Sequence, residues 1–170
     1  MENIIKGKIV VLSNNIDTDQ IYPGRFLALV DPKEIGKHCL EGIDEKTRVL
    51  VPGRIIIAGT NFGCGSSREH AVITLMNADV KAIIAESFAR IFFRNAINLG
   101  LPLVTCKNIL KKSENIGSDE EIVINIKEGT ITIGQGEVLQ SEKLGEHILN
   151  IIEAGGIKPM FLNKYSKEEK

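Results

Sequence analysis

Short apolar runs alternate along the chain with segments in which apolar residues recur at helical spacing. Continuous apolar runs occupy residues 9–12, 54–59, 81–85 and 101–104. Such runs are typical of strands that are buried on both faces of a sheet. Helix-like patterns separate the last three runs, over residues 70–77 and 88–99. The alternation of strands and helices predicts an α/β fold with a mostly parallel core sheet, flanked by helices and connected by right-handed crossovers.

Terminal signals mark several of the expected helices. Asp31 followed by Pro32 predicts the N-cap and first turn of a short helix that reaches about Leu40. Ser87 is expected to cap the helix predicted over residues 88–99, which Gly100 terminates.

The C-terminal third shows a different pattern. Isoleucines alternate with polar residues over 122–126 and 131–133, on either side of Glu128-Gly129, which predicts a hairpin. Ser141 is expected to cap a final helix that is closed by Gly155-Gly156.

Composition predicts one domain without a general nucleic-acid or membrane surface. The chain has 170 residues, 43% of them hydrophobic, which is enough for one core. We expect a single domain over 1–163 and a frayed tail over 164–170. Lysine and arginine number 21 against 22 acidic residues, and aromatic residues make up 5%, which argues against nucleic acid as a partner. No apolar run approaches the roughly 20 residues that span a bilayer, so we expect a cytoplasmic protein.

The three cysteines, Cys39, Cys64 and Cys106, are widely separated. Their odd number and spacing favour buried or spare thiols over a disulfide framework or a zinc site.

The segment FGCGSSREH, residues 62–70, is the strongest candidate for chemistry. Ser66 and Glu69 have the spacing of a capping box, which would need no ligand. That interpretation leaves the glycines, the second serine and Arg68 unexplained. Glycines at 63 and 65 allow several backbone amides to point into one space, and Arg68 offers a planar fork for a carboxylate or phosphate.

His70 lies one helical turn beyond Ser66. A serine-histidine pair is one interpretation, and a packed or capping histidine is the favoured one.

Three motifs together carry a resemblance. DTDQIYPG, GCGSSREH and SFARIFFRNAINLGLPL occur in the order of the small subunit of isopropylmalate isomerase, or 3-isopropylmalate dehydratase, in the aconitase superfamily. The resemblance covers at least residues 6–106. It implies a swivelling β/β/α domain that works with a separate large subunit. That partner would carry the [4Fe-4S] cluster, and this chain would bind no metal.

The resemblance also implies roles for single residues. Ser66 would act as an alkoxide base, while Gly65, Ser67 and Arg68 would bind a substrate carboxylate. Asp19 matches an active-site acid of the family, although an aspartate in a turn can simply bond its own backbone. The implied reaction removes water from a small dicarboxylic 2-hydroxy acid and returns it with the hydroxyl on the neighbouring carbon, as in leucine biosynthesis.

Substrate choice is expected in the loop at residues 24–32. Its apolar side chains suit the isopropyl group of isopropylmalate: Phe26, Leu27, Ala28, Leu29 and Val30. Relatives that act on homoaconitate-type substrates place an arginine at the position of Ala28, whereas the commoner pattern has a tyrosine at Phe26. That departure leaves 2,3-dimethylmalate and citramalate open as substrates. Arg25 is expected to be a solvated arginine, although a swing of the loop would bring it inward.

Two other classes of function also fit an anion site at a helix start. A non-enzymatic anion-binding or regulatory module would bind without turnover. A serine hydrolase would need a base and an oxyanion hole around Ser66.

Overall fold

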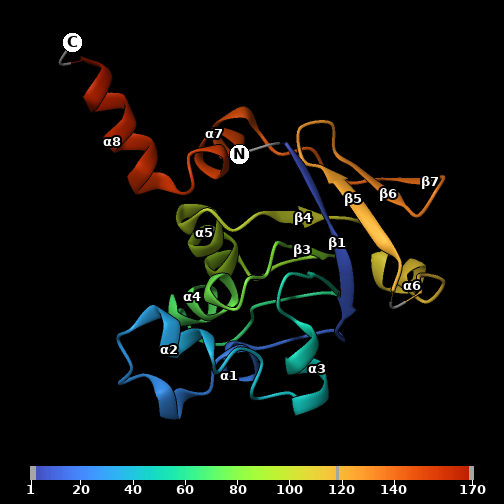
Figure 1. Ribbon diagram of the computed structural model, residues 1–170, viewed down its shortest axis with the longest axis horizontal. Helices are drawn as coiled ribbons and strands as arrows, with labels where there is room; N and C mark the ends of the chain where they lie inside the picture. Colours follow the sequence, from blue (N-terminus) through green and yellow to red (C-terminus); the bar gives the residue numbers. More distant parts are fainter. Residues whose placement is uncertain (1–2, 118, 169–170) are drawn as a thin grey trace.

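The computed structural model describes residues 3–117 and 119–168, which form one seven-stranded mixed sheet with helices (Figure 1). The strand order is β4-β3-β2-β1-β5-β6-β7. The strands are β1 Ile4–Val11, β2 Ile55–Ala58, β3 Ala82–Ala85, β4 Leu103–Thr105, β5 Glu121–Asn125, β6 Thr130–Ile133 and β7 Glu137–Gln140. Strands β1 to β4 are parallel, and β5, β6 and β7 continue the sheet in antiparallel fashion from the other edge of β1. The expected α/β fold with a parallel core is confirmed.

Most helices lie beside the parallel half of the sheet. Figure 1 shows β5, β6 and β7 on the other side of β1, and α8 extending away from the body. The helices are α1 Thr18–Ile21, η1 Gly24–Phe26, α2 Pro32–Gly36, α3 Glu45–Leu50, α4 His70–Asn77, α5 Arg90–Leu99, α6 Ile109–Ser113, α7 Glu146–Glu153 and α8 Ile157–Glu168. Helix α2 packs on α4, where the hydroxyl of Thr74 donates a hydrogen bond of 2.7 Å to the carbonyl of Ile35.

The core is densest at the two central parallel strands. Every residue of β2 and β3 is buried, as the continuous apolar runs predict. Burial of one isoleucine side chain contributes about 1.5–3 kcal/mol, so these strands form a rigid base for the loops that follow them.

The alternative interpretation of Ser66 and Glu69 as a capping box does not hold in the structure. Helix α4 begins at His70, and the Glu69 side chain makes no capping hydrogen bond. A capping box does occur at Asp17 and Gln20, where each side chain binds the backbone N–H of the other residue and starts α1. The motif residues before His70 are therefore free of a helical cap role.

Of the other two start signals, Asp31 caps α2 as predicted and accepts a 3.0 Å hydrogen bond from the backbone N–H of Lys33, whereas Ser87 acts differently. Ser87 does not cap α5, whose N-cap position is Ala89, and its hydroxyl instead accepts a 2.8 Å hydrogen bond from the backbone N–H of Asn61. The helix that begins after Asp31 ends at Gly36 and continues as turns to Leu40.

The expected hairpin is confirmed as β5 and β6, with Gly129 at φ +70° in the connection. A third strand, β7, extends it. Helix α7 has Gly145 at its N-cap position rather than the expected Ser141. Helix α8 occupies most of the expected tail 164–170, of which residues 169–170 lie outside the described range.

Candidate functional site

The candidate site is built from two loops that leave neighbouring parallel strands at the same edge of the sheet. The loop after β1 and the loop after β2 are joined by a parallel bridge between Asp17 and Cys64. Two backbone hydrogen bonds of 2.8 Å fix them, from Thr18 N–H to the Cys64 carbonyl and from Gly63 N–H to the Ile16 carbonyl. Ligand sites commonly form at the carboxyl ends of parallel strands, where adjacent loops converge.

Both glycines of the 62–70 motif are required by the close approach of these loops. Gly63 has φ +81°, and a Cβ there would overlap the ring of Phe92. Gly65 has φ +100°, and a Cβ there would lie 3.0 Å from Oγ1 of Thr18. A side chain at either position would strain the backbone; at Gly63 it would also collide with α5, and at Gly65 it would push against the loop after β1.

Ser66 is held by a threonine that sequence reasoning missed. Its backbone N–H donates to Oγ1 of Thr18 at 3.0 Å, and its Oγ lies 3.1 Å from the same Thr18 oxygen. Thr18 is 2% exposed, whereas Ser66 is exposed. Because Thr18 Oγ1 accepts the Ser66 N–H, its own proton is available to donate to Ser66 Oγ. A donor aimed at that oxygen would stabilise negative charge on it.

Asp19 and Arg68, predicted from different motifs, lie together. Nη1 of Arg68 is 2.7 Å from Oδ1 of Asp19. The Asp19 side chain is 67% exposed, so the ion pair itself contributes little stability. Its role in the geometry is orientation, because it fixes the arginine fork beside Ser66 while other guanidinium N–H groups stay available. Asp17, rather than Asp19, makes the backbone bond of the turn.

Backbone donors add to this cationic surface. Within the described residues, the amides of residues 67–70 have no hydrogen-bond partner, and they lie just before and at the start of α4. A helix start carries roughly half a positive charge. The carbonyl of Ser67 accepts a 3.3 Å hydrogen bond from Nδ2 of Asn95 on α5, which was also missed from the sequence. The exposed residues 65–67 and the half-buried Arg68 therefore form a surface for an anion.

His70 packs instead of pairing with Ser66. Its ring stacks on Tyr22 with centroids 5.7 Å apart, and the Tyr22 hydroxyl donates a 2.7 Å hydrogen bond to the Phe26 carbonyl. Burial raises the pKa of Tyr22, which keeps this hydroxyl a donor. The favoured interpretation of His70 as a packed residue agrees with this contact.

The loop at 24–32 begins beside the anion surface. A Cβ on Gly24 would lie 3.2 Å from Nη1 of Arg68. Ala28 and Val30 are exposed, Leu27 is 39% exposed and Leu29 is half-buried. The structure thus joins the start of this loop to Arg68 and leaves the apolar residues after it at the surface.

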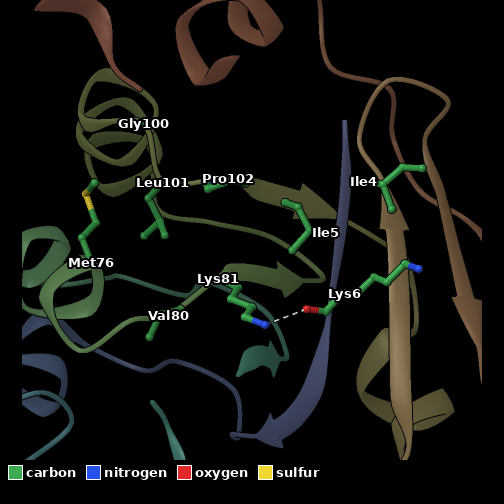
Figure 2. Close-up of a pocket in the computed structure, with 9 residues that line it drawn as sticks. All are labelled: Ile4, Ile5, Lys6, Met76, Val80, Lys81, Gly100, Leu101 and Pro102. Carbon is green, nitrogen blue, oxygen red and sulfur yellow. Dashed lines mark hydrogen bonds between the residues drawn. The ribbon is translucent and has the colours of Figure 1, made fainter. Parts of the chain in front are cut away.

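The site itself is open, and a large cavity lies elsewhere. Figure 2 shows a cavity of about 480 Å³ at the opposite, amino-terminal end of the parallel strands, lined by residues 4–6 and 100–102 with Met76, Val80 and Lys81. Nζ of Lys81 donates to the Lys6 carbonyl at 3.0 Å there. None of the predicted site residues lines this cavity.

The cysteines do not fit an iron–sulfur ligand set. Burial raises the pKa of Cys39 to about 12 and also raises the pKa of Cys106, whereas Cys64 is half-buried in the motif. Across residues 3–117 and 119–168, no three His, Cys, Asp or Glu side chains are grouped as a metal site would need. In the same ranges, no helix has both the length and the apolar character to cross a membrane.

Comparisons with known proteins place these features in context. Residues 45–108 match the Aconitase C-terminal domain family. The Isopropylmalate/citramalate isomerase small subunit of Methanocaldococcus jannaschii is 45% identical over 99% of this chain and 100% of its own length. The 3-isopropylmalate dehydratase small subunit 1 of Methanopyrus kandleri is 46% identical over 92% of each chain. A crystal structure of 3-isopropylmalate dehydratase from Methanocaldococcus jannaschii superposes with a TM-score of 0.87 at 37% identity, covering 98% of both chains.

Proposed function

We propose that this chain is the small subunit of a hydro-lyase that interconverts 2-isopropylmalate and 3-isopropylmalate in leucine biosynthesis, because it belongs to the family of 3-isopropylmalate dehydratase small subunits. The observation that carries this proposal is the convergence of Thr18, Asp19, Ser66 and Arg68 from two loops at one sheet edge. We place the enzyme in the cytoplasm, where amino-acid biosynthesis takes place.

In this proposal Ser66 removes the proton from the carbon beside a substrate carboxylate. The Arg68 fork, with the amides of Gly65 and Ser67, binds that carboxylate and lowers the cost of a second negative charge on Ser66. The Thr18 hydroxyl donates a hydrogen bond to Ser66 Oγ in its alkoxide form, before that oxygen takes the substrate proton, and Asp19 keeps Arg68 in place. In the reverse addition, Ser66 returns the proton to carbon.

We assign the chemistry at the departing hydroxyl to a large subunit. The open surface around Ser66 supports a site that a second chain must complete, because water would otherwise screen the charges that activate the serine. We also propose that any [4Fe-4S] cluster belongs to that partner, since Cys39 is buried beside Thr74 and Cys106 is buried beside the Gln140 carbonyl.

An apolar loop at 24–32 supports a substrate with a branched hydrocarbon group. Burying an unpaired carboxylate against Ala28 and Leu29 would cost several kcal/mol. Citramalate is a second candidate substrate, because a relative with 45% identity is named for both isopropylmalate and citramalate. Both substrates share the proton abstraction at Ser66 and differ only in the group that meets the loop.

The test is an anaerobic assay of the chain with and without a cluster-loaded large subunit. Turnover of isopropylmalate or citramalate only in the mixture would support the proposal. Ser66→Ala should lower kcat by at least about 10³-fold while the complex still assembles, because no other group replaces the base. Ser166→Ala, on the exposed face of α8, is the matched control. Binding of isopropylmalate without turnover by any loaded complex would favour the regulatory-module alternative, and rapid phosphonylation of Ser66 by a phosphonate reagent would favour a hydrolase.

A further inference from the structure

Arg25 stands next to the candidate substrate site but is bound away from it. Its Nη2 lies 3.0 Å from Oε1 of Glu41, and its guanidinium carbon lies 4.6 Å from the centroid of the Phe26 ring. The preceding residue, Gly24, packs against the Arg68 guanidinium. Because consecutive Cα atoms are about 3.8 Å apart, Arg25 starts close enough for its long side chain to reach the Arg68 surface if it were released.

The Glu41 carboxylate binds this arginine together with two other side chains. Its two carboxylate oxygens meet Arg25 at 3.0 Å, Nδ1 of His38 at 2.6 Å and Nη1 of Arg48 at 3.5 Å. The Glu41 side chain is 22% exposed, although Arg25 itself is 63% exposed. A single exposed ion pair would be weak, but several donors on one carboxylate hold the geometry together.

The backbone around Glu41 is fixed to helix α1, which carries Thr18 and Asp19 of the candidate site. Leu40 N–H donates to the Ile21 carbonyl at 2.8 Å, and Gly42 N–H donates to the Gln20 carbonyl at 3.1 Å. The His38 ring stacks on Phe26 with centroids 3.7 Å apart. Glu41 therefore keeps a defined position relative to loop 24–32.

We propose that Glu41 is a positioning residue for substrate choice: by binding Arg25, it keeps a guanidinium out of the substrate site. With Arg25 held, loop 24–32 presents apolar side chains to the substrate. With Arg25 free, the same loop would bring a cation to a substrate group that lies beyond the first carboxylate. This inference rests on the proposed function and adds a determinant of specificity to it.

The experiment compares kcat/KM for isopropylmalate and for homoaconitate, which carries an additional carboxylate, in the complex with the large subunit. Glu41→Gln should raise the preference for homoaconitate relative to isopropylmalate by about tenfold, the effect of one charge-assisted hydrogen bond. The double variant Glu41→Gln with Arg25→Met should return to the wild-type preference. Glu34→Gln, which removes a comparable exposed ion pair to Lys37, should leave the preference unchanged.

Two further measurements keep the inference testable if Glu41→Gln folds poorly. Arg25→Met alone should change kcat/KM for isopropylmalate by less than about threefold, and a larger loss would show that Arg25 already faces the substrate. In the isolated chain, trypsin should cleave after Arg25 several-fold faster in Glu41→Gln than in Glu34→Gln.

The outcomes distinguish a failure of the Glu41 role from a failure of the proposed function. An active wild type with an unchanged preference in Glu41→Gln, or a shift that persists without Arg25, would overturn the role of Glu41 alone. A wild-type complex with no turnover of any malate derivative would overturn the proposed function and this inference together.

Discussion

Thr18→Val tests whether the buried threonine activates Ser66. Valine nearly matches threonine in shape but removes the hydroxyl that accepts the Ser66 N–H at 3.0 Å and lies 3.1 Å from Ser66 Oγ. The backbone bond from Thr18 N–H to the Cys64 carbonyl, at 2.8 Å, does not depend on the side chain. The two loops should therefore stay joined while Ser66 loses its donor.

The expected loss follows from the charge that Ser66 carries in the proposed reaction. A hydrogen bond to a charged group contributes about 1.5–3 kcal/mol, which corresponds to roughly 10- to 150-fold in kcat/KM. The folded state should lose less, about 1 kcal/mol, because water can reach the Ser66 N–H at this exposed position. That loss would lower the melting temperature by roughly 2–4 °C in a chain of this size.

The assay is the pH profile of kcat/KM for the assembled complex, together with a thermal melt of the isolated chain. The rising limb of the profile should move to higher pH in Thr18→Val, because the basic form of Ser66 is less stabilised. Thr18→Ser keeps the hydroxyl and should keep the wild-type profile. A Thr18→Val complex within about threefold of the wild-type kcat/KM, with an unmoved limb, would refute the assignment of Thr18 as the donor to Ser66.

Other predictions concern the Arg68 guanidinium, the three cysteine thiols and the pH dependence of the stability that Glu41 contributes. Arg68→Lys should raise KM by about tenfold or more with a smaller change in kcat, because a point charge replaces a planar fork; steady-state kinetics with an unchanged KM would contradict this. A disulfide reagent at pH 8 should modify Cys64 well before Cys39 and Cys106, because burial raises the pKa of both core thiols and thiolate is the reactive form. Equal labelling rates would contradict the packing. Burial alone would raise the pKa of Glu41, but the hydrogen bonds that it accepts lower it overall. Its stabilising contribution is therefore present above the unfolded-state pKa of about 4.3 and lost as pH falls through the lower folded value. The difference in unfolding free energy between wild type and Glu41→Gln, measured by urea titration, should shrink from pH 6 to pH 3, and a constant difference would contradict the role of the charge.

The sequence predicted the parallel core because short continuous apolar runs are typical of strands with two covered faces, as β2 and β3 are. It predicted the anion surface for a similar local reason, since glycines, serines and an arginine within a few residues must share one space. The capping-box interpretation of Ser66 does not hold because the contact to Thr18 determines the backbone there, and that contact joins residues 48 positions apart.

Long-range contacts also explain the residues that were missed. Thr18 looks like an ordinary turn residue beside Asp17, and only the pairing of the loops after β1 and β2 brings it to Ser66. The third antiparallel strand, β7, has mixed polarity with a single buried residue, Leu139, so its pattern alone does not distinguish it from a loop.

The central place of β1 in the sheet has a consequence during synthesis. This strand leaves the ribosome before the other six strands of the sheet, and β2 can pair with one edge of it well before β5 is made to cover the other. At about 5–20 residues per second, the second edge waits several seconds. An uncovered strand edge is a template for pairing with other chains, so the nascent chain is most prone to aggregate after the loops of the candidate site exist and before its antiparallel half arrives.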